Sequence, residues 1–304
     1  MRRRFRYLVT GKDGQVAQSL LERHAAEENS TFEIITAARP AFDLSKLATV
    51  HHVIDEVKPD LIISAAAYTA VDQAESDEET ARVVNGEGPR ALAQAARSHN
   101  IPIIHLSTDY VFDGTKTSPY YEVDPVAPLG VYGHSKLQGE ESLLSIWENS
   151  AILRTAWVYS PFGRNFVKTM LRVAETRDEV SVVNDQVGNP TSALDVADAV
   201  LNVANNLLAD PDAKLRGVFH LTGYGEGSWA DFAEEIFKAS RKAGGPFATV
   251  KRIASTEYPT PAKRPANSRL NSDKLFSVHG VRLPHWRVST REIVIRLVKS
   301  KAYL

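Results

Sequence analysis

The chain has 304 residues, of which 43% are apolar and 24% charged, as in an ordinary globular protein. Its net charge of −1 provides no global basic field, so no nucleic-acid partner is expected. The absence of cysteine excludes disulfides, thiolate metal sites and cysteine nucleophiles. No stretch approaches the roughly 18 apolar residues of a membrane span, and the apolar run after the arginine-rich start is too short for a signal peptide. We therefore expect a cytoplasmic protein with no membrane partner.

The first half of the chain alternates segments of strand and helix character, the pattern of a parallel sheet covered on both faces. Segment 60–67 is apolar almost throughout, as a strand buried on both faces should be. Strands are expected at 5–10, 32–37, 60–67, 101–107 and 151–159, and helices at 15–27, 44–57, 77–98 and 135–147. The pattern predicts an α/β fold built on a Rossmann-type, doubly wound parallel sheet.

The second half is less regular and predicts a smaller α/β substrate-binding domain. Strands are expected at 180–183 and 218–222, and helices at 194–209 and 228–243, the second with Ser228 as its N-cap. The segment 257–269 is rich in proline and basic residues, so we expect an ordered loop or lid there. The predicted division is 1–155 and 180–225 for the dinucleotide-binding domain, and 156–179 and 226–304 for the substrate domain.

A glycine turn, Gly11-Lys-Asp-Gly14, follows the first expected strand and precedes the first expected helix. In this position backbone N–H groups approach a pyrophosphate at a helix N-terminus. The spacing from Gly11 to Ala17 has fewer glycines than the full dinucleotide fingerprint, so an ordinary glycine turn is the alternative. The location at the first strand–helix junction favours dinucleotide binding.

The second expected strand ends at Ala37-Ala38-Arg39, without the acidic residue that binds the ribose 2′-hydroxyl of NAD. The Arg39 guanidinium suits a 2′-phosphate, which favours NADPH as the cofactor, with NADH as the alternative. A solvated surface arginine is the other interpretation of Arg39.

Tyr132 is followed four residues later by Lys136, which places both side chains on one face if a helix begins at Tyr132. No other tyrosine of the chain has a lysine at this spacing. A free phenol has a pKa of about 10, and a neighbouring ammonium favours the phenolate, so we expect Lys136 to lower the pKa of Tyr132. The pair then suits general acid catalysis; an exposed helical pair is the alternative.

Thr108 lies at the carboxyl end of the expected strand 101–107, where functional sites gather in parallel sheets. Its hydroxyl could hydrogen-bond a substrate carbonyl and support the charge that develops on it. A capping turn at the strand end is the alternative. Thr108, Tyr132 and Lys136 occur in an order that favours them as one set more than any of them alone.

Eight segments spread over nearly the whole chain resemble, in the right order, the extended short-chain dehydrogenase/reductase family. Within that family they are similar to the dTDP-4-dehydrorhamnose reductases. The segments are 11–16, 64–72, 107–114, 131–140, 154–159, 165–170, 184–191 and 261–270. The resemblance implies NAD(P)H-dependent reduction of the C4 keto group of dTDP-4-dehydro-L-rhamnose, giving dTDP-L-rhamnose.

The resemblance also implies a role for each matched position. Tyr132 is the proton donor, Lys136 its activator and Thr108 the polar partner of the C4 oxygen. Trp157 and Arg264 suit a ring face and a diphosphate, although a core tryptophan and a solvated arginine are the alternatives. The implied substrate contacts are Thr108, Asp109, Tyr110, Trp157, Arg264 and Asn267. The implied cofactor contacts, besides Arg39, Tyr132 and Lys136, are Gly11, Gly14, Gln15, Val16, Asp43, Leu44, Ala65, Ala66, Thr69 and Val71.

The resemblance does not extend to a metal. Some relatives join two subunits around Mg²⁺ through acidic residues, but Ser19 and Leu194 stand at the matching positions here. Mg²⁺ binds proteins through carboxylates, so no metal is expected. We expect a monomer or a weak homodimer.

Three other functions remain as alternatives. The first is reduction of another dTDP-linked 4-keto-6-deoxyhexose. The second is a dehydratase or epimerase, although Thr108-Asp109-Tyr110 lacks the second carboxylate that elimination of water requires. The third is a non-catalytic NADP-binding regulatory subunit, which would not need to keep the proton donor Tyr132.

Overall fold

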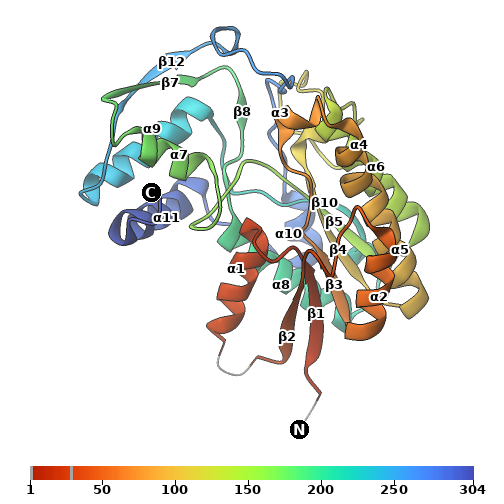
Figure 1. Cartoon of the computed structure of the whole chain (residues 1–304). Helices are drawn as coiled ribbons and strands as arrows, with labels where there is room; N and C mark the ends of the chain where they lie inside the picture. Colours follow the sequence, from red (N-terminus) through yellow and green to blue (C-terminus); the bar gives the residue numbers. More distant parts are fainter. Residues whose placement is uncertain (1–2, 28–29) are drawn as a thin grey trace.

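The computed structural model describes residues 3–27 and 30–304. A six-stranded parallel sheet lies at its centre, with the strand order β10-β5-β4-β3-β1-β2 (Figure 1). The expected α/β fold with a parallel sheet is confirmed. Residues 1–2 and 28–29, which the predicted domain 1–155 includes, lie outside the described residues. The strands are β1 (Phe5–Thr10), β2 (Phe32–Ala37), β3 (Leu61–Ser64), β4 (Ile103–Thr108), β5 (Ser150–Thr155) and β10 (Gly217–His220).

Helices cover both faces of the sheet, and β1 shows why its strands are apolar throughout. Tyr7 and Val9 pack in the core beneath α1 (Gln15–Ala25) and α8 (Ala193–Ala209), while Leu8 packs in the core on the opposite face. That second face is covered by α2 (Leu47–Val57), α5 (Gly88–His99) and α6 (Val131–Ile146). The short α10 (Asp273–His279) adds Leu275 to the core on the α8 side.

Chain order reverses around β1, because β2 lies on one side of it and β3 on the other. Ligands of doubly wound sheets bind at such a switch point, outside the carboxyl ends of the strands. Gly11 follows β1 there, and its α-carbon faces Ala66, which follows β3. The fold therefore places the predicted cofactor residues of two separate segments against each other.

A separate hydrophobic core is built by elements of the second half (Figure 1). It contains α7 (Phe166–Val173), α9 (Trp229–Lys242) and α11 (Trp286–Ser300), with β7 (Glu179–Val183) paired in parallel with β12 (Thr249–Ile253). β7, which the domain prediction grouped with the central sheet, packs its Val180 and Val182 in this second core. The domain boundaries stay a prediction.

Several predicted elements differ in their bounds. Helix α6 begins at Val131 rather than at Ser135, and the expected helix 77–98 divides into α4 (Glu78–Arg82), a π-helix (Val83–Glu87) and α5. The expected strand 151–159 is interrupted because Trp157 has a positive φ of 46°, which separates β5 from β6 (Val158–Tyr159). The predicted cap at Ser228 is confirmed by reciprocal hydrogen bonds with Asp231.

Short elements complete the fold. The expected loop 257–269 contains no α-helix, and only the 3₁₀ turn Ser255–Glu257 overlaps its first residue. Within the described chain, no helix combines the length and the apolar character needed to cross a membrane. The remaining elements are α3 (Val71–Ala74), the 3₁₀ turns Asp109–Val111 and Ala213–Leu215, and the two-residue strands β8 (Val187–Gly188), β9 (Thr191–Ser192) and β11 (Gly227–Ser228).

Candidate active site

Helix α6 carries Tyr132 in its first turn because the helix begins at Val131, with Gly130 as an extended N-cap. The Glu75 carboxylate accepts a hydrogen bond from the Val131 N–H at 2.9 Å and so satisfies one of the free donors at the helix start. Gly133 allows the helix to approach the Tyr110 carbonyl so closely that a side chain would collide with it. The condition for a shared Tyr132–Lys136 face is therefore met.

Thr108 and Tyr132 meet at the carboxyl end of β4. The Tyr132 hydroxyl lies close enough to the Thr108 side chain for hydrogen bonding to lower the Tyr132 pKa. The Tyr110 ring meets the Tyr132 ring edge-on, with 5.6 Å between ring centroids. Thr108 is itself held by donating to Asp109 Oδ1 at 3.0 Å and accepting from the Tyr110 N–H at 3.2 Å. The structure thus brings the predicted proton donor and its predicted polar partner together.

The expected lowering of the Tyr132 pKa is not found in the structure. Burial raises the pKa of Tyr132 to about 12, although the nearby Thr108 side chain opposes this. The Lys136 ammonium points instead toward the Leu106 carbonyl. A neighbouring positive charge lowers the pKa of a phenol, whereas burial raises it because the phenolate loses its hydration. Burial is the larger of the two effects at Tyr132. At neutral pH the phenol therefore carries its proton.

Lys136 is buried one turn further along α6. Its Nζ donates to the Leu106 carbonyl at 2.7 Å and lies 3.3 Å from His105 Nε2. Burial lowers the pKa of Lys136 to about 8, and the negative charge of Glu140 acts in the opposite direction. With this pKa, Lys136 can change its charge near neutral pH, as groups in functional sites often do.

Asp109 is a buried carboxyl group directly beside Thr108. Burial raises the pKa of Asp109 to about 6, and the nearby Ser268 and Thr108 hydroxyls act against this rise. Ser268 belongs to the predicted loop 257–269. The carboxyl group of Asp109 therefore lies between the strand end and that loop.

The Pro-rich loop 257–269 reaches the site through Arg264. Its guanidinium donates to Asp72 Oδ2 at 2.8 Å and lies close to the Tyr110 hydroxyl. Asp72 also accepts from the Ala262 N–H at 3.2 Å. Because Tyr110 contacts Tyr132, Arg264 lies close to the predicted proton donor rather than facing bulk solvent elsewhere.

Asn267 lies in the same loop but has a different environment. Its Nδ2 donates to the carbonyls of Lys116 at 2.6 Å and Ser118 at 3.0 Å, and its Oδ1 accepts from Arg269. The amide therefore anchors the loop to the segment after β4. No contact with Tyr132 is present in the described residues.

Trp157 forms part of a tryptophan pair. Its ring stacks on Trp229 with 3.6 Å between centroids and an interplanar angle of 6°. Gly188 packs against the Trp157 ring where any side chain would collide with it. The partly exposed Trp157 thus belongs to the edge of the second core, so both the core and the ring-stacking interpretations remain open.

The glycine turn fits a dinucleotide phosphate. Gly11 has a φ of 86°, which favours glycine, and Gly14 is the N-cap of α1 without a side-chain cap and with open space where a Cβ would lie. Thr10 Oγ1 accepts from the N–H groups of Ala65 at 3.0 Å and Ala66 at 2.9 Å, which holds the neighbouring wall against the turn. Free N–H groups at a helix start are suited to a pyrophosphate.

The Gln15 side chain is already committed to protein contacts. Its Oε1 accepts from Ser160 at 2.8 Å and from Asn165 at 3.1 Å, and its Nε2 donates to the Val158 carbonyl at 3.4 Å. Gln15 therefore links the cofactor turn to β6 and the start of α7. Its side-chain oxygen is thus engaged by protein donors, and its backbone N–H in the first turn of α1 is a group that could contact a phosphate.

The other predicted cofactor residues line the carboxyl edge of β2 and β3. Arg39 is exposed. Hydrogen bonds from Ser45 are the main cause of the lowered pKa of Asp43, and the positive charge of Arg39 contributes to the lowering. Leu44 is buried and faces the start of α5. The remaining wall residues range from buried to exposed and are Val16, Ala65, Ala66, Thr69 and Val71.

Two buried polar residues that sequence reasoning missed support the site. Asn85, in the π-helix, accepts from the Tyr68 N–H at 2.8 Å and donates to the Tyr68 carbonyl and to Ser135 Oγ, each at 3.0 Å. Asn85 thereby links the segment after β3, which carries predicted cofactor residues, to α6. His105 contacts Lys136 from β4. In the sequence, both Asn85 and His105 could have been noticed as polar residues within an otherwise apolar strand or helix.

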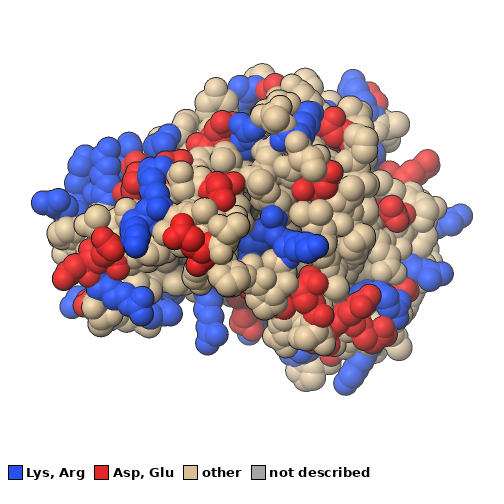
Figure 2. Space-filling view, turned by 90° about the horizontal axis from the view of Figure 1, so that it is seen from above, with Lys and Arg blue, Asp and Glu red and all other residues tan. Residues whose placement is uncertain are grey.

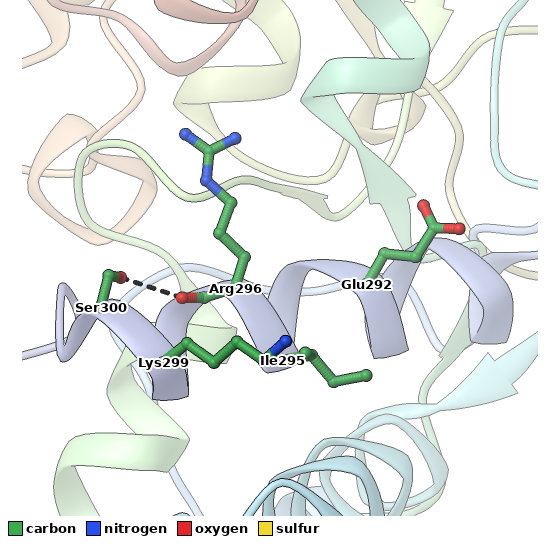
Figure 3. Close-up of a pocket in the computed structure, with 5 residues that line it drawn as sticks. All are labelled: Glu292, Ile295, Arg296, Lys299 and Ser300. Atoms are coloured by element: carbon green, nitrogen blue, oxygen red, sulfur yellow. Dashed lines mark hydrogen bonds between the residues drawn. The ribbon is translucent and has the colours of Figure 1, made fainter.

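A hollow away from this site lies along one face of α11 (Figure 3). Its volume is about 580 Å³, and all the residues that line it belong to α11. Arg296, drawn pointing away from the helix, forms an ion pair with Glu22 at 2.6 Å. Within the described residues no predicted site residue borders this hollow, which is a surface feature.

Charge is mixed on the outer surface. Figure 2 shows acidic and basic side chains interspersed over most of the face seen from above, with basic ones gathered toward one end. No field of one sign covers this face, so an anionic ligand would depend on individual arginines. No group of three or more histidine or acidic side chains suited to a metal is present among the described residues.

Comparison with known proteins places these features in a family. A family model described as "RmlD substrate binding domain" matches residues 5–299. The curated dTDP-4-dehydrorhamnose reductase of Sinorhizobium fredii is 52% identical over 96% of this chain and 98% of its own length. The protein of the same name from Escherichia coli K12 is 40% identical over 97% of this chain and 99% of its own length.

Solved structures agree with the sequence relatives. The crystal structure of a dTDP-4-dehydrorhamnose reductase from Clostridium acetobutylicum has a TM-score of 0.88 and 37% identity, covering 96% of this chain and 99% of that one. The structure of a dTDP-4-dehydrorhamnose reductase from Bacillus anthracis, in complex with NADP, has a TM-score of 0.87 and 32% identity at the same coverage. This chain therefore belongs to the dTDP-4-dehydrorhamnose reductase family, to which the matched RmlD substrate binding domain corresponds.

Proposed function

We propose that this protein reduces the C4 keto group of dTDP-4-dehydro-L-rhamnose to give dTDP-L-rhamnose, with NADPH as the hydride source. The relatives' names support this activity, and the relative from Bacillus anthracis was crystallised with NADP. The observation that carries the proposal is the proximity of the Tyr132 hydroxyl to Thr108 at the carboxyl end of β4, with Lys136 on the next turn of the same helix face.

The proton for the new hydroxyl comes from Tyr132. The pKa of Tyr132 is raised to about 12, so the phenol is protonated throughout the neutral range. Its hydroxyl lies beside that of Thr108, so both can face one carbonyl oxygen, where Thr108 would support the developing charge and Tyr132 would deliver the proton. Lys136 lies on the same helix face and can support the phenolate that remains.

The chain's own residues fit the cofactor. We propose that the N–H groups after Gly11 and Gly14 hold the pyrophosphate, and that Lys136 holds a ribose. Arg39 is exposed at the end of β2 and would bind the 2′-phosphate of NADPH. The other proposed wall residues are Gln15 through its backbone, Val16, Asp43, Leu44, Ala65, Ala66, Thr69 and Val71.

The substrate is proposed to lie between the end of β4 and the Pro-rich loop. Asp109 and Tyr110 border it from the strand side, and Arg264 would bind the diphosphate. Trp157 offers a ring edge beside Trp229. Asn267 would act by holding the loop in place, because its amide is already bound to the carbonyls of Lys116 and Ser118.

A product assay tests the function. Purified protein is given NADPH and a panel of dTDP-linked 4-keto-6-deoxyhexoses, and the products are identified by chromatography and NMR. Turnover of dTDP-4-dehydro-L-rhamnose with the highest kcat/KM is expected. Preferential turnover of another sugar of the panel would move the proposal to that sugar. NADPH binding without any turnover would favour the regulatory subunit.

We also propose a metal-independent monomer or weak homodimer. Ser19 donates to the Gln15 carbonyl at 2.8 Å, Leu194 has no ligand atom, and Asp195 accepts from Ser289 at 2.5 Å. Activity should therefore survive EDTA, and the mass measured by light scattering should not depend on Mg²⁺. Loss of activity and of a dimer on chelation, restored by Mg²⁺, would contradict this.

A further inference from the structure

A chain of three buried polar side chains joins β3, β4 and α6 behind the candidate catalytic residues. His105 Nδ1 lies 3.0 Å from Ser64 Oγ, and His105 Nε2 lies 3.3 Å from Lys136 Nζ. Ser64, His105 and Lys136 are 1%, 0% and 2% exposed, so water does not compete for these contacts. The strand order places β3 beside β4, which is why Ser64 reaches His105.

The chemistry of the three groups sets the direction of the hydrogen bonds. An ammonium can only donate, so His105 Nε2 must accept from Lys136. The proton of the neutral ring is then on Nδ1, which donates to Ser64 Oγ. Burial and the neighbouring Lys136 hold the pKa of His105 well below its ordinary value, so the ring stays neutral and keeps this acceptor.

Two of the three Lys136 protons are therefore assigned by the protein. One is donated to the Leu106 carbonyl at 2.7 Å and one to His105. Because the donors of an ammonium are tetrahedrally arranged, fixing two of them fixes the direction of the third. We infer that His105 is a positioning residue for the reduction, which orients the free N–H of Lys136 toward the cofactor and Tyr132. This inference rests on the proposed function.

His105 also affects the range of pH in which Lys136 is charged. Burial lowers the pKa of Lys136 to about 8, whereas Glu140 on the next turn raises it. Tyr132 lies one turn before Lys136 on α6, and its phenol is neutral in this range. A hydrogen bond accepted by a neutral ring favours the charged form of lysine, so its removal should lower the Lys136 pKa further.

A matched pair of substitutions separates positioning from packing. His105→Gln keeps an acceptor near the position of Nε2, whereas His105→Asn keeps only a polar group near Nδ1. We expect His105→Gln to retain kcat within about threefold and His105→Asn to lose roughly tenfold to hundredfold, the range of one hydrogen bond to a charged group. The alkaline limb of the kcat–pH profile should move to lower pH by about one unit in His105→Asn only.

Two readouts do not depend on turnover. NADPH dissociation constants, measured by nucleotide fluorescence, should rise severalfold in His105→Asn and remain unchanged in His105→Gln. Thermal midpoints show whether both variants are folded. Equal kcat, equal NADPH binding and an unmoved alkaline limb in the two variants would overturn the inference.

Ser64→Ala provides the second test, which also applies if the His105 variants fail to fold. It removes the partner of Nδ1 and allows the tautomer that places a proton on Nε2, against the ammonium. A smaller loss of kcat and the same direction of pH shift are expected, and an unchanged profile would contradict the positioning role. Failure of the proposed function is distinguished because it would appear as absent turnover in the unsubstituted protein.

Discussion

As the proposed proton donor, Tyr132 would have to release a proton from a site that disfavours the phenolate. Burial, with a smaller contribution from the negative charge of Asp109, raises the pKa of Tyr132 to about 12, whereas the nearby Thr108 side chain acts to lower it. The phenol is therefore a reliable store of one proton but a weak acid. Release of this proton becomes favourable only when negative charge develops on the substrate oxygen and cationic charge faces the ring.

Removal of the phenol hydroxyl tests this role. Tyr132→Phe keeps the ring that meets Tyr110 edge-on, so folding and NADPH binding should change little. General acid catalysis contributes about 10²–10⁴-fold, and kcat should fall within that range in steady-state assays. A variant that keeps more than half of the kcat would exclude Tyr132 as the donor.

Arg39 is expected to decide between the two nicotinamide cofactors. It is exposed at the end of β2, where a 2′-phosphate would lie. Loss of one charge-assisted contact in Arg39→Ala should raise the KM for NADPH roughly tenfold while the KM for NADH stays nearly constant. If the preference for NADPH survives the substitution, another group binds the phosphate.

At the scale of elements, the Pro-rich loop is held over the site by the Asp72–Arg264 ion pair, with an N–O distance of 2.8 Å. The same arginine contacts Tyr110, which itself meets Tyr132. We propose two roles for this one side chain: closing the loop and binding the substrate diphosphate. The two roles make different predictions for the two partners.

Substitution of each partner separates these roles. Arg264→Ala should raise the KM for the dTDP-sugar roughly tenfold to hundredfold, because it removes both the loop contact and the diphosphate contact. Asp72→Ala removes only the loop contact and leaves the guanidinium free, so its KM should change much less. KM values that rise equally in the two variants would show that Arg264 acts only through the loop.

At the scale of the whole molecule, buried neutral histidines make the fold sensitive to acid. Burial lowers the pKa of His220 to about 3 and that of His279 to about 4, compared with about 6.5 in an unfolded chain. Below pH 6.5 the unfolded chain binds protons that the folded protein does not, so stability falls with pH until the folded pKa is reached. Asp109, with its pKa raised to about 6, acts in the opposite direction below pH 6.

A comparison with His220→Asn isolates the contribution of one histidine. Unfolding free energies are measured by urea titration between pH 8 and pH 5. Any loss of packing in the variant is present at every pH, whereas the advantage of the original protein should shrink below pH 6.5 by up to about 1.4 kcal/mol per unit. A difference that stays constant across this range would show that His220 has the same pKa in the folded and the unfolded protein.

Local sequence determined the sheet and the order of its functional segments. Apolar runs of strand length, glycine after β1, the strand end at Thr108 and the spacing of Tyr132 and Lys136 are features of neighbouring residues, so they could be predicted. The predicted strand 151–159 was too long, since β5 ends at Thr155, because the left-handed turn at Trp157 depends on packing against Trp229 and Gly188. The start of α6 was displaced because its N-terminus is completed by Glu75, which is distant in sequence.

The electrostatics of the site were decided by the tertiary structure alone. Desolvation depends on how much of the folded chain surrounds a group, and no spacing rule contains that quantity. Hence the pKa of Tyr132 is raised rather than lowered, and Lys136 is held by His105 and the Leu106 carbonyl. The same holds for Arg264, whose partner Asp72 lies 192 residues away. The sequence alone indicated which groups could react, whereas long-range packing decided which proton each of them carries.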